Sequence, residues 1–577
     1  MMKTARTLCC TLRLLSATAS IAAPVALLGA AMVACDDEND PKTWVKRLDD
    51  PAQRANAMKR LAQFYDDDMT RANNNANAPE VKSLLDVIID PLTKQYTAGG
   101  IDEKTRVDLM KFLAETHDPR TQPALAKALK DFEMGKTDNE ARVACESINA
   151  MAKASVKLDQ NVIDELWNLF SQFRLSKTTS ERLYHAVHDA VLAVHDASYG
   201  DKAIEKLKAP VSTDNVDSIK DQVNWWQLTS IQVISELRYT KAVKPLVLVL
   251  LTPAKIDLNA TTRSSLLKMA KDAEPELIKA LNGQDPDYVK AGEAFKDKAH
   301  LAIVADTLAL LSRPAGRDAL LNALPSADTD TTRTAFAQAL VQFPEDPRVE
   351  PAFLAAYNKI PWNASVELFG ALKPRAALAQ ASANLYDANL TDWLIKETAK
   401  APDAASKLLT IEAALKLMPP NKKADVDKTL QKVKADLPPD VFQASRQMFD
   451  FAAGVVDKCG TNATCYVGVL DEPIPTTPTT ANLRAVKASW MAVVYGKPAA
   501  AATRSELLRR VDKVKEASAR LALVEAIDEL TPAGDVATAE ALEKTVAADQ
   551  KTGDKSVMMA DDSVIKIAQR LRARAAP

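Results

Sequence analysis

Short helical stretches separated by Pro, Asp and Ser recur along the chain, and this pattern limits what the chain can fold into. One stretch places its apolar residues on a single helical face: Leu301, Val304, Leu308 and Leu311. Residues 314–317 interrupt the pattern, and further amphipathic stretches follow at 320–324 and 336–343. One amphipathic helix cannot bury its apolar face alone, so a long series of them predicts an array of stacked helix pairs.

The composition agrees with a fold made of helices. Only 15 of the 577 residues are glycine, and 5% are aromatic. Runs of β-branched residues with the alternation of a strand are few. A chain of this length would ordinarily hold several domains, but stacked repeats can extend one core continuously. We therefore expect an all-α fold.

Arginines recur along the chain at intervals close to 36 residues. The landmark positions are Arg106, Arg142, Arg263, Arg333, Arg484 and Arg520. An arginine near the start of the second helix of a pair, with Pro or Asp-Pro opening the first, resembles the HEAT repeat. Residues 118–125 and 274–281 resemble its first helices. The resemblance implies a right-handed α-solenoid of irregular HEAT-like helix pairs. Tetratricopeptide arrays are the nearest alternative, but their Trp/Gly/Tyr pattern does not recur.

The N-terminal residues have the pattern of a bacterial export signal. Three basic residues within the first 13 precede an uncharged stretch, 14–34, and an acidic segment follows Cys35. Residues 32–35, Met-Val-Ala-Cys, resemble a lipobox, in which the cysteine is acylated and becomes the first mature residue. The resemblance predicts a signal peptide over 1–34, lipid attachment at Cys35 and an acidic tether over 35–43. This order of features is similar to that of HEAT-repeat lipoproteins of Gram-negative bacteria.

Two alternatives to lipidation remain open. An ordinary secretory signal would be cut near Ala30 or Ala31, and an uncleaved signal would form a membrane helix, although Pro24 and many small residues make it a poor span. Loss of residues 1–34, which hold three basic residues and no acidic one, would change the net charge from −2 to −5. A mildly acidic chain without a basic block is a poor ligand for nucleic acid.

The remaining cysteines fit an oxidising compartment. Cys145 lies in a helical apolar pattern and is predicted to be a buried small hydrophobe. Cys459 and Cys465 are predicted to form a disulfide that closes a small loop, as exported proteins permit. A metal site at this pair is disfavoured, because two thiolates need further ligands and no histidine lies near in sequence.

The expected domain organisation follows from these features. Residues 471–480 hold three prolines among threonines and predict an extended linker. We divide the mature chain into a HEAT-like solenoid over 44–455, a Cys-loop and Pro/Thr linker over 456–480, and a C-terminal HEAT-like block over 481–577. The last block would cap the solenoid.

The best candidate for chemistry is a group of histidines. On a helix, His185, His188 and Asp189 share one face and could chelate a divalent metal. His195 lies about 10 Å beyond His188 along such a helix and cannot join the same ion. Three partly exposed histidines on an amphipathic helix are the simpler interpretation. We therefore assign no metal site and keep His185, His188 and Asp189 as weak candidates.

A pair of tryptophans is the other candidate. Trp225 and Trp226 could form an aromatic platform for a ligand. Trp226 is in helical register with the apolar residues around it and is predicted to lie in the core. Trp225 is predicted to line a groove or to pack on the next repeat. Packing is the favoured interpretation for the pair.

Sequence motifs of catalysis are absent. The chain has no glycine-rich phosphate loop, no Gly-x-Ser-x-Gly and no His-Glu-x-x-His, and it has five histidines. We expect no enzyme and no cofactor. The first hypothesis is a membrane-anchored interaction scaffold of the cell envelope that binds envelope proteins on its concave face. The alternatives are a metal- or small-ligand-binding solenoid using His185 and His188, a secreted scaffold without lipid, and an enzyme with an unrecognised carboxylate site.

Overall fold

The computed structural model describes residues 37–174, 181–210, 217–367, 371–472, 482–552 and 555–575. The predicted signal peptide, Cys35 and most of the Pro/Thr linker lie outside these ranges. No helix of the described ranges is both long and apolar enough to cross a membrane. The chain forms two compact units, which meet between Ile101 and Asp102. The sequence did not single out this position, and the boundaries we placed at 456–480 stay a prediction.

The described part of the first unit, residues 37–101, holds three helices. They are α1 (Pro41–Arg47), α2 (Arg54–Arg71) and α3 (Pro79–Ala98). The side chain of Asp40 caps α1 by accepting a hydrogen bond from the Lys42 N–H at 3.0 Å, and Trp44 Nε1 donates to the Glu38 carbonyl at 2.9 Å. The cap and Pro41 start the helix, so residues 41–43, which the sequence analysis placed at the end of the acidic tether, are helical.

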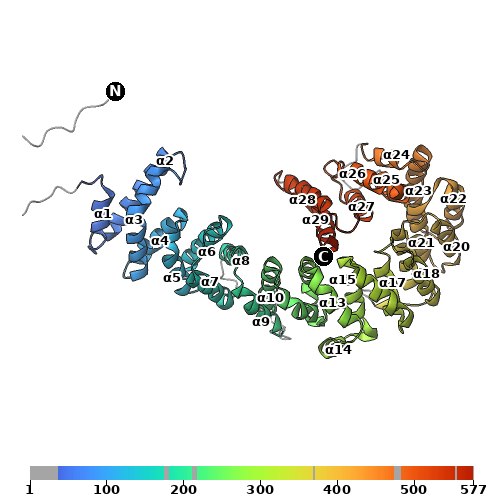
Figure 1. Ribbon diagram of the computed structural model, residues 1–577, viewed down its shortest axis with the longest axis horizontal. Helices are drawn as coiled ribbons and strands as arrows, with labels where there is room; N and C mark the ends of the chain where they lie inside the picture. Colours follow the sequence, from blue (N-terminus) through green and yellow to red (C-terminus); the bar gives the residue numbers. More distant parts are fainter. Residues whose placement is uncertain are drawn as a thin grey trace, which may run out of the picture. The chain divides into compact units, whose positions relative to one another are not determined.

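The helices of the second unit alternate between two layers along the chain (Figure 1). The first layer holds the first helix of each pair: α5 (Gln122–Lys130), α7 (Gln160–Gln172), α9 (Ser198–Lys208), α11 (Val243–Leu250), α13 (Ala270–Leu281), α16 (Pro314–Ala323), α18 (Val349–Lys359), α20 (Leu390–Lys400), α22 (Lys423–Lys432), α24 (Ala463–Val469), α26 (Ala500–Leu508) and α28 (Val536–Gln550). An additional short helix, α14 (Pro286–Gly292), follows α13.

The second layer holds the partner helices of the pairs. They are α4 (Glu103–Thr116), α6 (Asp138–Lys153), α8 (Glu181–Ala193), α10 (Asp217–Leu237), α12 (Asn259–Lys268), α15 (His300–Leu311), α17 (Asp330–Leu340), α19 (Pro374–Ala381), α21 (Ala404–Leu417), α23 (Pro439–Cys459), α25 (Asn482–Gly496), α27 (Ala517–Glu529) and α29 (Lys555–Ala575). The array is therefore an α-solenoid, and the helix pairs also continue through 150–235 and 400–450, where the sequence lacked landmarks.

Short elements fill the connections. The 3₁₀ turns are η1 (Pro119–Thr121), η2 (Thr240–Ala242), η3 (Pro253–Leu258), η4 (Lys296–Lys298), η5 (Leu324–Ser326), η6 (Ser382–Leu385), η7 (Pro420–Lys422) and η8 (Lys497–Ala499). Between α18 and α19, β1 (Val366–Glu367) pairs antiparallel with β2 (Ala371–Leu372), with Val366 opposite Leu372. This ribbon is the only sheet within the described ranges, so the fold class is all-α as predicted.

The aspartates that punctuate the sequence act as helix caps. Asp102, Asp403 and Asp535 accept hydrogen bonds from backbone N–H groups in the first turns of α4, α21 and α28, at 3.0, 3.0 and 3.1 Å. Each cap satisfies a donor that the helix itself leaves without a partner. The local sequence therefore determines where these helices begin.

The landmark arginines all lie on second-layer helices, in α4, α6, α12, α17, α25 and α27, as the resemblance to HEAT repeats predicts. Their partners differ. Arg106 binds Glu140 of the next second-layer helix with contacts of 2.9–3.1 Å, whereas Arg333 binds Asp330 within its own helix. The arginines mark equivalent places in the pairs but do not form one uniform ladder.

Polar contacts between successive pairs repeat the spacing of the array. Tyr199 Oη donates to the carbonyl of Ile163, 36 residues earlier, at 2.7 Å. Lys244 pairs with Asp285, 41 residues later, at 2.8 Å. These links join equivalent positions of neighbouring pairs, because one repeat separates their partners.

The C-terminal block is attached to the preceding helices by buried polar contacts. The Lys487 ammonium, which is 4% exposed, donates to the carbonyls of Leu415, Lys416 and Met418 at 3.0, 2.8 and 2.9 Å. These carbonyls lie at the C-terminus of α21, where a cation also meets the negative end of the helix dipole. Burial holds the pKa of Lys487 well below its usual range. α25 therefore continues the solenoid from α21.

The last helix of the second layer packs against helices from the middle of the array. Each of α12, α15, α17, α19, α21, α25, α27 and α29 contacts the next, and α29 contacts α12, α13 and α15. Figure 1 shows the C-terminus beside α13 and α15. We call this arrangement the closed circuit. The C-terminal block, which we expected to cap an end, thus packs on helices more than 200 residues earlier.

Candidate functional site

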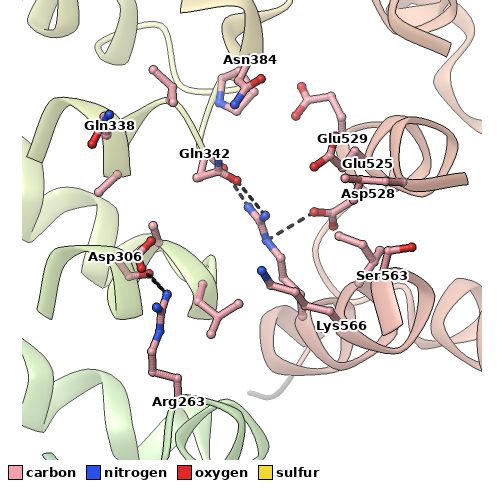
Figure 2. Close-up of a pocket in the computed structure, with 18 of the residues that line it drawn as sticks. Arg263, Asp306, Gln338, Gln342, Asn384, Glu525, Asp528, Glu529, Ser563 and Lys566 are labelled. Atoms are coloured by element: carbon pink, nitrogen blue, oxygen red, sulfur yellow. Dashed lines mark hydrogen bonds and ion pairs between the residues drawn. The ribbon is translucent and has the colours of Figure 1, made fainter. Parts of the chain in front are cut away.

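A hollow of about 540 Å³ lies inside the closed circuit. Its walls come from α12, α15, α17, the residues around η6, α27 and α29. The hollow is thus bounded on one side by the middle of the solenoid and on the other by the C-terminal block (Figure 2). Its volume is in the range of ligand-binding pockets.

Two ion pairs form part of the lining. Arg263 pairs with Asp306 across α12 and α15. Arg570 of α29 lies with its Nε atom 3.3 Å from Asp528 and donates from Nη1 to the side chain of Gln342 at 3.0 Å. Figure 2 labels Arg263 with Asp306, and it also labels Gln342 and Asp528, the partners of Arg570. Because these charges are already paired, they shape the wall more than they attract a ligand.

Glu525 and Glu529 are different, because their environment opposes their ionisation. They extend from α27 into the hollow (Figure 2). Burial raises the pKa of Glu525, and the cationic groups of Lys416, Arg570 and Lys566 offset this only in part. For Glu529, burial together with the nearby carboxylates of Glu345 and Asp528 raises the pKa to about 7.

The counter-charge of Glu529 is a single lysine. Lys497 Nζ lies 3.4 Å from Glu529 Oε1, and the glutamate side chain is 11% exposed. Titratable groups with raised pKa values in a cavity are common at functional sites. The sequence analysis missed both glutamates, because they resemble any other acidic residues of a helix and no motif marks them.

An apolar contact accompanies the carboxyl groups. Leu521, one turn before Glu525 on α27, lines the hollow and is 42% exposed. Large apolar side chains with comparable exposure are few among the described residues: Met134, Ile256, Val289 and Met558. The hollow therefore offers an apolar side chain beside two incompletely compensated carboxyl groups, which suits binding.

The lining shows no assembled nucleophile. Its serine, Ser563, donates to the Ala560 carbonyl at 2.9 Å rather than to a base. No histidine or cysteine belongs to the lining. A nucleophilic mechanism needs a hydroxyl or thiol in contact with a base, and Ser563 makes its hydrogen bond to a carbonyl instead.

Comparisons with known proteins give a limited likeness. No model of a protein family matches the sequence, and no curated protein matches it. Among solved structures, a mutant of Kap121p is 11% identical with a TM-score of 0.40, covering 92% of this chain and 66% of that one. Importin beta is 9% identical with a TM-score of 0.31, covering 93% and 74%. The chain thus spans about two thirds of the length of Kap121p.

TM-scores below 0.5 do not establish a common fold, so the assignment depends on the helix pairs themselves. Paired helices in two layers, arginines on the second layer and links one repeat apart decide it. The fold is a HEAT-like α-solenoid. The position of the hollow follows from this architecture, since second-layer helices alone form its walls apart from the residues around η6 and those following α17.

The predicted histidine group does not converge on one point. His188 ring nitrogens lie 3.0 Å from Asp189 Oδ1 and 3.0 Å from Gln232 Oε1. His185 and His195 are exposed. Within the described ranges, no group of three or more His, Cys, Asp or Glu side chains is arranged to hold a metal ion. The neighbouring helix α10 supplies an amide to His188 where a metal site would need a ligand such as a carboxylate or imidazole.

Trp225 packs on a neighbouring repeat, which was one of its two predicted roles, whereas Trp226 is not buried in the core as predicted. Trp225 is 4% exposed and packs against Phe170 and Phe173, with ring centroids 5.0 and 5.4 Å apart. Trp226 is half-buried, and the side chains of Arg174 and Lys206 lie over its ring at 4.7 and 4.5 Å. The prediction assumed one apolar face, but α10 packs against α8, α9 and α12 and is therefore buried on several sides.

The cysteines of the described part lie as follows. Cys459, at the end of α23, is joined to Cys465 of α24 with an S–S distance of 2.05 Å. Cys145 is a free, buried thiol in α6, and burial raises its pKa. After α24, Asp471 pairs with Arg510 at 2.6 Å. Cys35, the predicted site of lipid attachment, lies outside the described residues.

Proposed function

We propose that the protein is a protein-interaction scaffold of the bacterial cell envelope, held on a membrane by a lipid on Cys35, and that the hollow receives a segment of its partner. The observation that carries the proposal is the lining of the hollow. Leu521 is uncovered there, and Glu525 and Glu529 lack sufficient counter-charge. The inner surfaces of solenoids typically bind extended segments or helices of other proteins.

Export and anchoring are supported by the sequence of the N-terminus and by the cysteine pair. A lipobox-like Met-Val-Ala-Cys precedes an acidic segment. The Cys459–Cys465 disulfide suits an oxidising compartment such as the periplasm or the cell surface. In this proposal the lipid holds the solenoid at the membrane and leaves the hollow accessible to an envelope protein.

Photo-crosslinking in intact cells tests the role of the hollow. A photoreactive amino acid replaces Leu521 in the hollow or, as a control, Val289 on α14; these side chains are 42% and 45% exposed. We expect one protein to be captured from position 521 but not from 289, and the yield to fall in the Glu525→Gln/Glu529→Gln background. Equal capture at both positions, or none at either, would contradict the proposal.

Cell fractionation tests the anchor separately. We expect the Cys35→Ala variant to leave the membrane fraction, because it lacks the thiol that would carry the acyl chains of a lipoprotein. If the variant stays membrane-bound after a high-salt wash, lipidation is wrong. If the unaltered protein is itself soluble, the secreted scaffold is the correct alternative.

A further inference from the structure

The contact between α29 and the middle of the solenoid is built around one arginine. Arg570 donates from Nη1 to Gln342 Oε1 at 3.0 Å, and from Nη2 to the Gln342 carbonyl and to Ser312 Oγ, both at 3.1 Å. Its side chain is 12% exposed. The acceptors come from the ends of α15 and α17 and together form a receptor for a guanidinium group.

A second arginine meets the end of the same helix. Arg313, at the start of α16, donates from Nη1 to the carbonyl of Ala573 at 2.8 Å. Glu274 of α13 positions Arg313 through a contact of 2.9 Å and also accepts from the Gly316 N–H at 2.7 Å. A cation at the C-terminus of a helix is favoured by the helix dipole and by the carbonyls left without partners there. The solenoid thus recognises an arginine and, three residues later, a helix end.

The large apolar cluster of the C-terminal block does not extend across this contact. The buried apolar cluster that joins α23–α29 includes Val564, Ile567 and Leu571 of α29 but no residue of α12–α17. The hollow of about 540 Å³ lies along the same boundary. We call this boundary the seam. Close packing contributes most of the stability of helix contacts, so we expect the seam, where this cluster ends and a hollow lies, to be weaker than the contacts of α29 with α27 and α28.

We propose that the face formed by Ser312, Arg313 and Gln342 is a docking site for a helix, which α29 of the same chain occupies until a partner helix displaces it. The competing helix carries an arginine on its last turns and a free C-terminal carbonyl three residues later, as α29 does with Arg570 and Ala573. The inference rests on the proposed scaffold function for its partner, but the site itself is defined by α29 alone.

The intramolecular contact sets how strongly a partner must bind. A face that is occupied for most of the time presents only its open fraction to a partner, which weakens the apparent affinity by that fraction. Weakening the contact of α29 should therefore strengthen binding of a competing helix. An affinity that rises when the contact of α29 is weakened distinguishes a displaceable contact from a permanent part of the fold.

The experiment uses the full chain and a labelled synthetic peptide of residues 555–577. We expect the peptide to bind the Arg570→Ala chain about 10-fold more tightly than the unaltered chain, since a hydrogen-bonded charge is worth about one order of magnitude or more. In the Arg570→Ala chain, Arg574 still pairs with Asp528, so α29 keeps a contact with α27. Circular dichroism checks that this variant is folded.

Matched peptides test the chemistry of recognition. A peptide with Arg570→Ala should bind about 10-fold more weakly, whereas one with Arg572→Ala should bind within about 2-fold of the original. Arg572 binds Glu543 of α28 with contacts of 2.7 Å and does not touch the seam. Replacing Gln342 by Ala in the Arg570→Ala chain should also weaken binding, because the guanidinium then loses an acceptor.

Two results would overturn the proposal. They are no binding of the peptide to the Arg570→Ala chain and equal binding of the two altered peptides. Peptide binding that requires Arg570, combined with no protein captured at Leu521 in cells, would leave the docking face intact and refute the scaffold function. Protein capture at Leu521 without peptide binding would support the scaffold function and refute the docking face.

Discussion

The helix α29 makes two joints of different character. Its contact with α27 and α28 contains a large apolar cluster. Arg520 is fully buried at this contact and lies 2.8 Å from Asp549 and 2.7 Å from Asp561. Against the middle of the solenoid, α29 relies on hydrogen bonds of Arg570 beside a hollow. The first joint cannot part without exposing that cluster and separating the buried charges, whereas the second lies outside the cluster. This difference supports the proposal that the contact of α29 with the middle of the solenoid opens while its contacts with α27 and α28 remain.

The buried triad explains the strength of the first joint. Burial opposes ionisation of Asp549, but Lys515 and Arg520 hold its pKa below its usual range. For Asp561, burial dominates and raises the pKa despite Arg520. A buried arginine between two carboxyl groups therefore stabilises the block mainly because removal of any one member leaves the others uncompensated.

The largest effect is expected at the first joint. Arg520→Ala should lower the free energy of unfolding by about 3–5 kcal/mol, because two buried carboxyl groups lose their cation. Urea denaturation at neutral pH measures this loss. Arg509→Ala is the control, since Arg509 is 72% exposed and pairs only with Glu506 of its own turn. Similar effects of the two substitutions would show that the triad does not dominate the block.

The next effect is a pH dependence that arises in the hollow. Glu529 has a pKa of about 7 in the folded protein and an ordinary value of 4.5, so the folded state holds a proton that the unfolded state releases. Its contribution to stability is complete below about pH 4.5 and disappears as the pH rises through about 7, a loss of about 2–3 kcal/mol. Unfolding measured from about pH 5 to pH 8 should show this decline.

Two substitutions distinguish the source of this decline. Glu529→Gln should remove the part of the decline that Glu529 causes and leave the parts due to Glu525 and Asp561, whose pKa values are also raised. Glu543→Gln should leave the decline unchanged, because the Arg572 side chain lowers the pKa of Glu543, so its own contribution is lost only at acidic pH. If stability declines by the same amount in Glu529→Gln as in the unaltered chain, the pH dependence belongs to other groups.

A smaller effect on stability is expected at the second joint. Arg570→Ala should lower the free energy of unfolding by at most about 2 kcal/mol, as for a few hydrogen bonds to a charged group. Hydrogen exchange should nevertheless increase in the last turn of α29 and at the start of α16, where the seam opens. Arg572→Ala should leave both regions protected. A global loss of protection in Arg570→Ala would show that the seam and the block unfold together.

The smallest effect is expected outside both joints, at the histidines. His185→Ala/His188→Ala should change the free energy of unfolding by about 1 kcal/mol or less, because the side chains are exposed or half-buried. Elemental analysis of the purified protein should find no metal in stoichiometric amount. Bound zinc that disappears in the double variant would restore the hypothesis of a metal-binding solenoid.

The sequence predicted the local features of this protein because their causes are local. Asp102 and Asp403 start helices through contacts within one turn, and the arginine interval near 36 residues follows from one helix pair per repeat. The core position of Trp226 was predicted wrongly, because the number of helices that pack around α10 is not encoded in its own periodicity. The same applies to Glu525 and Glu529, whose raised pKa values depend on residues from other helices.

By itself, then, the sequence determined an all-α array of HEAT-like pairs separated by Pro and Asp. Only the tertiary structure decided that the array returns on itself, with Arg570 meeting Gln342 228 residues away and Arg313 meeting Ala573 260 residues away. The physical reason is that a small rotation at each repeat accumulates over many repeats into curvature. No single repeat shows where the array will contact itself. The hollow exists only beside that contact.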